Sequence, residues 1–383
     1  MVNSDKNELY IKGKEMSDDR TDRWQMAAQA IVNAGMAPYE IGDTLIGILQ
    51  EIMDNKQADF VKIFSEKPSL NLDQIKEKCG WEEDTILKML DSLMHGGVVV
   101  GTTSKSTGIM VYRLLGPVPG LFEYTNLRGE TDDKHKRLAR LFEKLADERR
   151  QMAQENYDTF SEASKAMPPL VRIVPIEEEI GETVDKIMPT EEVSGIIDKF
   201  DDVTLAHCYC RHAKDLLDKS CQVTDERLNC ILLGKSARFA ADYKFGKAVT
   251  REEAKQVLAK AADEGLVHKA FHIHLSTDLD EEAICNCCKC CCGPFQSYHK
   301  GMSPYHCYSS YLAEVNIDTC TACEECVELC PVDAIEMVDM AAFVKNDGCI
   351  GCGVCVHQCA EESIQLLRTE SRNVYLPLKR VNA

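Results

Sequence analysis

The residues of this chain best suited to chemistry are its cysteines. The sequence has 383 residues and 20 cysteines, and all of them except Cys79 lie between Cys208 and Cys359. A deprotonated cysteine is a soft sulfur ligand for zinc ions and for iron–sulfur clusters. Disulfide bonds are another common use of many cysteines, but they form in oxidising compartments. We interpret the chain as cytoplasmic, and we therefore expect these thiols to bind metal.

Two tandem motifs near the C-terminus have the most specific spacing. "CTACEECVELCP" at 320–331 and "CIGCGVCVHQCA" at 349–360 both read C-x₂-C-x₂-C-x₃-C. Three cysteines at this spacing let one tight loop surround a cluster, and the fourth cysteine of each motif reaches across to the other cluster. The spacing therefore predicts two 4Fe–4S clusters. One is assigned to Cys320, Cys323, Cys326 and Cys359, and the other to Cys349, Cys352, Cys355 and Cys330.

These motifs make residues 312–368 similar to the bacterial dicluster ferredoxins. The resemblance implies that this segment transfers single electrons. "AIEMVDMAAFVKND", between the two loops, is expected to form two short paired strands. From Tyr311 to Glu370 the sequence has 12 acidic residues and 2 basic residues. Such an anionic surface favours a redox partner protein with a basic docking patch.

A second set of cysteines lies in two tracts, "AHCYCRH" at 206–212 and "ICNCCKCCCGP" at 284–294. We favour one or two further iron–sulfur clusters here. A structural zinc ion on Cys208, Cys210, Cys221 and Cys230 and a metallothionein-like metal store are the alternatives. The candidate ligands of this region are Cys208, Cys210, Cys221, Cys230, Cys285, Cys287, Cys288, Cys290, Cys291 and Cys292.

The two tracts are expected to meet in one core, although roughly 75 residues separate them. Unligated thiols at this density would be prone to oxidation, and neither tract has enough apolar neighbours to be buried alone. A helix from a Thr250 cap to Gly265 would bring the second tract back to the first. Together with "IVPIEEEI", these tracts resemble a broad family of iron–sulfur proteins of anaerobic metabolism, of a CxCR/ICNCC type, over residues 170–368. The resemblance implies electron transfer in a reducing cytoplasm.

The N-terminal half, whose only cysteine is Cys79, must position this metal-binding half. Apolar spacing is helical from Ile41 to about Ile63. A short helix follows, from an Asn71 cap to Gly80, then a helix in "WEEDTILKMLDSLMHGG" and two strands in "VVVGTTSKSTGIMVYRLL". This order resembles the winged-helix fold. The helix that would enter DNA begins with acidic residues at 82–84, so the pattern favours protein docking over nucleic-acid binding.

We predict an α+β multidomain protein. The segment 132–167 is expected to be one long amphipathic helix that stops at Pro168 and Pro169. The expected parts are a polar tail with a leading helix at 1–40, a winged-helix-like domain at 41–118, a helical linker at 119–168, a cysteine-rich central α/β module at 169–310, the ferredoxin domain at 311–370 and a C-terminal tail at 371–383.

Composition excludes several classes of protein. A net charge of −19 opposes non-specific binding to nucleic acid. The sequence has no run of about 20 apolar residues that could span a membrane, and its N-terminus has no apolar signal segment. Nucleotide-binding fingerprints are also absent from the sequence. We interpret the chain as an electron-transfer component of an oxidoreductase rather than a complete enzyme. The alternatives are an iron–sulfur redox sensor that reads DNA, and an oxidoreductase with catalysis at the central module.

Overall fold

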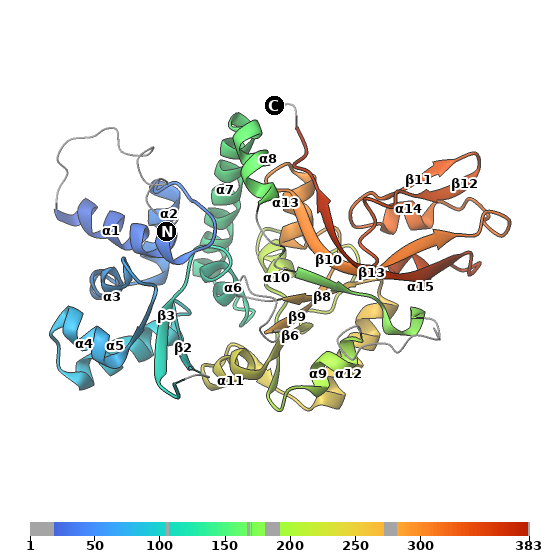
Figure 1. Cartoon of the computed structure of the whole chain (residues 1–383). Coiled ribbons are helices and arrows are strands. Elements are labelled where there is room, and N and C mark those ends of the chain that lie inside the picture. The colour runs from blue at the N-terminus through green and yellow to red at the C-terminus, as the bar shows by residue number, and fades with distance from the viewer. Residues whose placement is uncertain are drawn as a thin grey trace.

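A computed structural model describes residues 19–104, 107–166, 169, 171–180, 192–271 and 282–381. Most of the expected N-terminal tail, at residues 1–18, lies outside them. The described residues form helices and strands, and the strands make up sheets of three, eight and two strands. This mixture is consistent with the predicted α+β multidomain class. Figure 1 shows the N-terminal helices at one side, the large sheet beyond α7, and β11 and β12 at the far end.

The N-terminal part consists of helices around a small antiparallel sheet of order β1-β3-β2. The predicted helix at 72–79 is confirmed: the Asn71 side chain accepts a hydrogen bond from the Gln74 amide at 2.9 Å, and Gly80 ends the helix at φ 65°. Asn caps the start and glycine tolerates the left-handed end. The elements are α1 (Asp19–Ala34), α2 (Asp43–Ile52), α3 (Asn55–Val61), η1 (Lys62–Phe64), β1 (Ser69–Asn71), α4 (Leu72–Cys79), α5 (Glu83–His95), β2 (Val99–Thr103) and β3 (Met110–Leu114).

The expected continuous helical run from Ile41 to Ile63 is wrong at one point. Met53 is extended, with φ −122° and ψ 152°, and separates α2 from α3. Asp54 then starts α3, because its carboxylate accepts a hydrogen bond from the Gln57 amide at 2.8 Å. A capping box at this point satisfies free amides that a continuous helix would not leave exposed. The apolar stripe therefore continues across two short helices.

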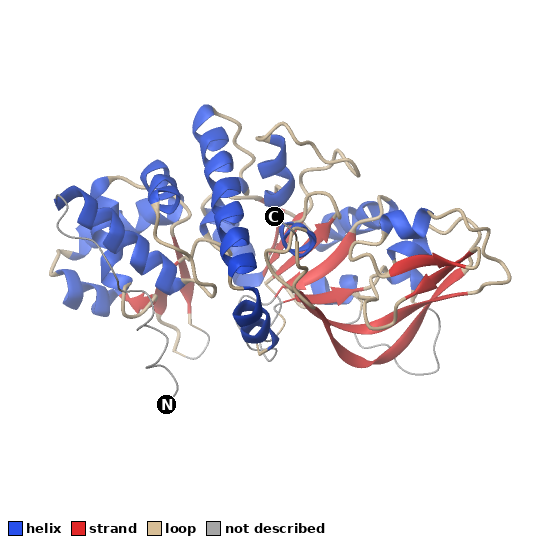
Figure 2. Ribbon diagram, turned by 90° about the horizontal axis from the view of Figure 1, so that it is seen from above, coloured by secondary structure: helices blue, strands red, loops and turns tan. Residues whose placement is uncertain are grey.

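The expected single helix over 132–167 is also two helices. After α6 (Leu121–Asn126), α7 (Asp133–Glu155) ends where Asn156 leaves helical geometry at φ −111° and ψ 35°, and α8 (Tyr157–Lys165) follows. The Asn156 side chain donates to the Met152 carbonyl at 3.0 Å, which satisfies a helix-end acceptor. Pro168 lies outside the described residues. Figure 2 shows α7 standing between the N-terminal part and the strands.

The large sheet has the strand order β13-β10-β4-β8-β9-β6-β5-β7. Its strands are β4 (Val171–Val174), β5 (Val203–Ala206), β6 (Cys230–Leu233), β7 (Lys247–Ala248), β8 (Val267–Phe271), β9 (Ala283–Cys287), β10 (Tyr305–Val315) and β13 (Ile364–Leu376). The other elements of this half are η2 (Glu177–Glu179), α9 (Val193–Asp198), α10 (Tyr209–Asp215), α11 (Gly234–Asp242), α12 (Arg251–Asp263), α13 (Gly293–His299), α14 (Glu325–Leu329), β11 (Ile335–Val338), β12 (Ala341–Val344) and α15 (Val354–His357).

The sheet joins the central and ferredoxin segments. β10 and β13 pair antiparallel over their length, from Tyr305 with Leu376 to Val315 with Ile364. β10 also pairs with central strand β4. The expected domain boundaries at 310 and 370 thus fall inside β10 and β13, and β13 continues into the expected C-terminal tail. β11 and β12 form the antiparallel pair predicted between the two cysteine loops.

Among the described helices, none combines the length and the apolar character needed to cross a bilayer.

Candidate metal centres

The two central cysteine tracts lie against each other, as predicted. Strands β6 and β9 pair directly, with Cys230 opposite Cys285. The Gly293 amide donates to the Cys210 sulfur at 3.2 Å, which joins the end of the second tract to the first. Helix α12 has the predicted Thr250 capping box, and Gly265 follows its end at φ 71°. Antiparallel pairing and a correctly capped helix thus bring distant cysteines together.

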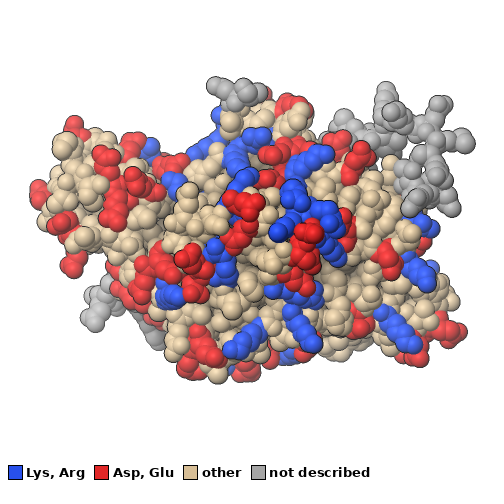
Figure 3. Space-filling view, turned by 180° about the vertical axis from the view of Figure 1, so that it is seen from behind, with Lys and Arg blue, Asp and Glu red and all other residues tan. Residues whose placement is uncertain are grey.

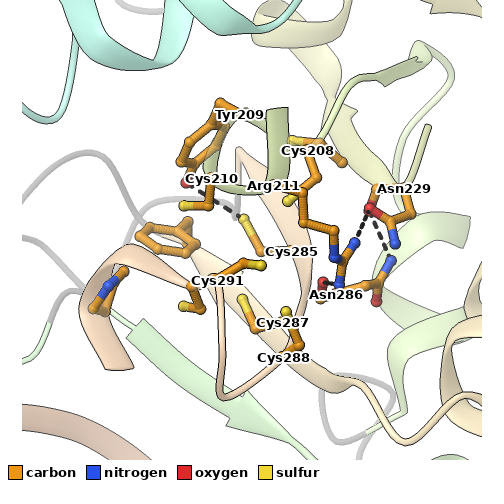
Figure 4. A pocket seen from close by; sticks show the side chains of 14 residues that line it. Cys208, Tyr209, Cys210, Arg211, Asn229, Cys285, Asn286, Cys287, Cys288 and Cys291 are labelled. Atoms are coloured by element: carbon orange, nitrogen blue, oxygen red, sulfur yellow. Dashed lines mark hydrogen bonds between the residues drawn. The ribbon is translucent and has the colours of Figure 1, made fainter. Parts of the chain in front are cut away.

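A cavity lies where the tracts meet. Figure 4 shows sulfur atoms from both tracts facing this space. Tyr209 closes one side, with its hydroxyl 3.7 Å from the Cys285 sulfur. The cysteines that line the cavity are Cys208, Cys210, Cys230, Cys285, Cys287, Cys288, Cys291 and Cys292.

Two fully buried cations accompany these sulfurs. The Lys269 ammonium lies 3.3 Å from the Cys292 sulfur and 3.3 Å from the centre of the Phe295 ring. The Arg211 guanidinium donates to the Asn229 side chain at 2.7 Å and to the Asn286 carbonyl at 2.8 Å (Figure 4). Both side chains have an exposed fraction of 0%. Because a buried charge requires a counter-charge, the surrounding cysteines are suited to act as thiolates.

Burial raises the pKa of the Cys208 thiol, and it raises the pKa of the Cys210 thiol well above its ordinary value. Without a metal, these thiols would keep their protons and leave the two buried cations poorly compensated. Metal binding replaces thiol protons. The donor set and its cations therefore fit an anionic metal–sulfur group.

A group of four cysteines, two of which (Cys288 and Cys291) also line this cavity, is packed more tightly. The sulfur atoms of Cys221, Cys288, Cys290 and Cys291 all lie within 4.8 Å of one another. The four cysteines considered as zinc ligands from the sequence therefore do not lie in one group. Cys221 belongs to this group, whereas Cys208, Cys210 and Cys230 line the cavity on the side of Cys285.

The ferredoxin segment brings cysteines of its two motifs together. A second cavity is lined by one cysteine of the first motif and three of the second. Backbone amides point at their sulfurs: Ala334 donates to Cys330 at 3.2 Å and Gly351 donates to Cys349 at 3.4 Å. Such amides fit an anionic iron–sulfur cluster. The four cysteines are Cys330, Cys349, Cys352 and Cys355, all buried.

The remaining four motif cysteines lie nearer the surface. Cys320, Cys326 and Cys359 pack against the same apolar core, and burial first, then the neighbouring thiols of Cys323, Cys320 and Cys359, raise the pKa of Cys326. Cys323 is exposed and the other three are half-buried. The Ser363 amide donates to the Cys359 sulfur at 3.4 Å. One group thus faces solvent, and the other lies between it and the central sheet.

Sequence reasoning missed Lys269, Arg211 and the role of Cys307. Lys269 lies in "VHKAF", where a lone cation inside an otherwise apolar strand was the available signal. Cys307 is fully buried in β10. Burial raises the pKa of Cys307 to about 12, whereas the charges of Lys269 and Arg372 lower it. This thiol shares an apolar core with Cys292 of the central region and Cys349 of the ferredoxin segment.

Comparison with known families agrees with this geometry. Residues 313–360 match the family model of the 4Fe-4S dicluster domain. This segment contains all eight motif cysteines. The chain thus carries an iron–sulfur domain of the type associated with electron transfer. Searches of curated proteins and of solved structures found no match to the chain.

Proposed function

We propose that the protein transfers electrons through two 4Fe–4S clusters in a cytoplasmic, anaerobic oxidoreductase system. The first cluster would be held by Cys320, Cys323, Cys326 and Cys359, and the second by Cys349, Cys352, Cys355 and Cys330. The observation that carries the proposal is the match of residues 313–360 to the dicluster domain. The grouping of each set across the two motifs supports it, since dicluster ferredoxins exchange their fourth ligands in this way.

The exposed first group is the natural exit for electrons. Acidic side chains surround it on α14 and on the turn after α15, including Glu325, Glu328, Glu361 and Glu362, all exposed. Figure 3 shows Asp and Glu gathered on the ferredoxin lobe, at the left of that view. The partner would therefore be a redox protein with a basic docking patch, because opposite charges speed productive encounter.

The central cavity would hold a further iron–sulfur cluster. Cys208, Cys210, Cys287 and Cys292 are its best ligands, because they interact with one another, and Cys287 and Cys292 also lie next to the buried Lys269 ammonium. The Lys269 charge would offset the negative charge of such a cluster. Electrons could then pass between this site and the ferredoxin clusters by way of the second group, which shares an apolar core with Cys287 and Cys292.

The N-terminal part would dock the oxidoreductase. Its helices and its β1-β3-β2 sheet support the winged-helix resemblance. The start of α5 exposes Glu82, Glu83 and Asp84, which would repel DNA phosphates. A redox-sensing regulator remains the second candidate on the fold pattern alone. Specific DNA binding that depends on the state of the clusters, seen in low-salt gel shifts, would favour it.

Iron analysis tests the main proposal. Anaerobically purified protein should contain about eight iron atoms or more, with a broad visible absorbance that dithionite bleaches. Cys355→Ser should lose about four iron atoms, whereas Cys79→Ser, outside every cysteine group, should lose none. Fewer than about six irons in reconstituted wild-type protein would contradict two clusters.

A further inference from the structure

The four cysteines Cys221, Cys288, Cys290 and Cys291 have a geometry unlike that of the other groups. Three of their sulfur–sulfur distances are 3.6 Å (Cys221 to Cys288), 3.7 Å (Cys221 to Cys290) and 3.6 Å (Cys290 to Cys291). A disulfide bond is only about 2.0 Å long, and all four are free thiols. The group is therefore a compact set of four separate sulfur donors.

These distances discriminate between a single ion and a cluster. A tetrahedral ion with zinc–sulfur bonds of about 2.3 Å separates its sulfurs by about 3.8 Å. In a 4Fe–4S cluster each thiolate binds a different iron, so the sulfurs lie roughly 6 Å apart. All four sulfurs here lie within 4.8 Å of one another. The group fits one ion and is too small for a cubane cluster.

The position of the group suggests what an ion would do there. Cys221 lies in the irregular segment between α10, which ends at Asp215, and β6, which begins at Cys230. The other three cysteines come from the second tract, and Leu266, after α12, packs against them. An ion would therefore tie a segment without regular structure to the second tract. Long irregular segments are uncommon in compact domains, and they are usually either functional or disordered.

The surrounding charge fits a metal-bound tetrathiolate. Four thiolates around a divalent ion carry a net charge of −2, which requires nearby cations. The Arg211 guanidinium is fully buried and lines the same cavity as Cys288 and Cys291. Arg227 also lies near Cys221 and is held by Asp215 at 3.0 Å.

We propose that Cys221, Cys288, Cys290 and Cys291 bind one structural zinc ion, separate from the iron–sulfur clusters. Zinc is favoured over ferrous iron because it binds a given site more tightly, and four-coordinate thiolate sites are its usual structural form. The ion would be redox-inactive, so this site lies outside the proposed electron path. The ion would instead stabilise the fold of the central region, by joining the segment that contains Cys221 to the second cysteine tract.

Metal analysis of the full chain tests the site. Protein produced with both zinc and iron supplied should contain about one zinc ion per chain in addition to its iron. Cys221→Ser should lose most of the zinc and keep its iron, because Cys221 belongs to this group and to none of the cluster sets. Cys79→Ser is the matched control and should keep both metals.

Zinc K-edge X-ray absorption of the wild-type protein gives a second measurement that does not depend on the folding of a variant. The expected signal is a single shell of four sulfurs with no neighbouring metal. Wild-type protein without zinc, zinc bound through nitrogen or oxygen, or a mononuclear iron in this site would overturn the assignment. Loss of iron in Cys221→Ser, with zinc unchanged, would also overturn it. The iron count of the wild-type protein separately decides the proposed electron-transfer function.

Discussion

At the scale of single residues, the cysteines differ most in what surrounds them. Those lining the second ferredoxin cavity are buried and receive backbone amides, whereas Cys323 faces solvent. The central cysteines instead face two buried cations, Lys269 and Arg211. Reduction potentials of iron–sulfur clusters depend on local charge, hydrogen bonds and solvent exposure. The neighbours of each cysteine group therefore give any cluster bound there a different reduction potential.

Gly351 shows how closely the second loop is packed. It has φ 63°, and a Cβ atom there would lie 2.2 Å from the Tyr311 carbonyl oxygen. We expect Gly351→Ala to displace the loop that carries Cys349 and Cys352, and to lose about four iron atoms per chain. Gly348→Ala is the control, because its nearest contact would be the Ala334 Cβ atom at 3.3 Å. Iron analysis measures both, and full iron content in Gly351→Ala would contradict the prediction.

Lys269 offers a test of the central site. Replacing it with Met removes a buried positive charge 3.3 Å from the Cys292 sulfur while keeping most of the side-chain volume. If a cluster is bound there, its reduction becomes less favourable, and we expect a potential lower by roughly tens of millivolts. A redox titration followed by electron paramagnetic resonance measures this shift. Lys88→Met, on exposed α5, should leave every potential unchanged; an equal effect of both variants would argue against the central site.

At the scale of elements, helix α6 contains a carboxyl group, that of Glu123, whose ionisation lowers the free energy of unfolding at neutral pH. Burial raises the pKa of Glu123 to about 7, and its carboxylate accepts a hydrogen bond from the Gly120 amide at 2.5 Å. In the unfolded chain this group ionises near its ordinary pKa of 4.5. The folded state therefore binds more protons, and stability falls as the pH rises from about 4.5 to about 7.

Glu123→Gln should remove this pH-dependent loss of stability, because glutamine does not ionise, and it keeps an oxygen acceptor for the Gly120 amide. We expect the variant to gain stability over the wild type as the pH rises, on the order of 2 kcal/mol at pH 8 and little at pH 5. Chemical unfolding followed by circular dichroism at several pH values measures the difference. A difference that does not change with pH would show that Glu123 is ionised in both states.

Local patterns were predictable from the sequence, and long-range pairings were not. The cysteine spacing, the Asn71 and Thr250 caps and the β11–β12 pair depend on neighbouring residues, which the sequence displays directly. The breaks at Met53 and Asn156 depend on competing local hydrogen bonds that leave apolar periodicity intact. The division of Cys221 from Cys230 depends on contacts between distant segments, which residue spacing does not encode. The meeting of the two tracts was predictable because dense thiols need burial or metal.

At the scale of the whole molecule, charge is unevenly distributed. The ferredoxin lobe is strongly acidic, as Figure 3 shows, and the more exposed cysteine group lies on it. Under the proposed function, electrons that leave through this group would pass a surface whose charge attracts basic proteins. The opposite end carries acidic α5, which Figure 1 shows far from the ferredoxin segment.

Neutralising two acids of this lobe should slow electron transfer. We expect Glu325→Gln/Glu328→Gln to reduce a basic acceptor such as cytochrome c several-fold more slowly than wild-type protein at low ionic strength. The difference should vanish in high salt, which screens exposed charges. Glu82→Gln/Asp84→Asn, on the N-terminal part, removes the same charge and should change the rate little. Stopped-flow absorbance measures the rates, and equal slowing by both variants would point to net charge rather than to a docking surface.

The strands β10 and β13 also determine how the molecule unfolds. Because they run from the central sheet into the ferredoxin segment, with one irregularity in their pairing between Ser309 and Tyr311, melting one region removes hydrogen-bond partners from the other. We therefore expect the ferredoxin and central regions to unfold as one cooperative unit. On heating, calorimetry should show one transition. The visible cluster absorbance and the circular dichroism of the large sheet should be lost in that same transition. A ferredoxin segment joined by a flexible linker would instead melt separately.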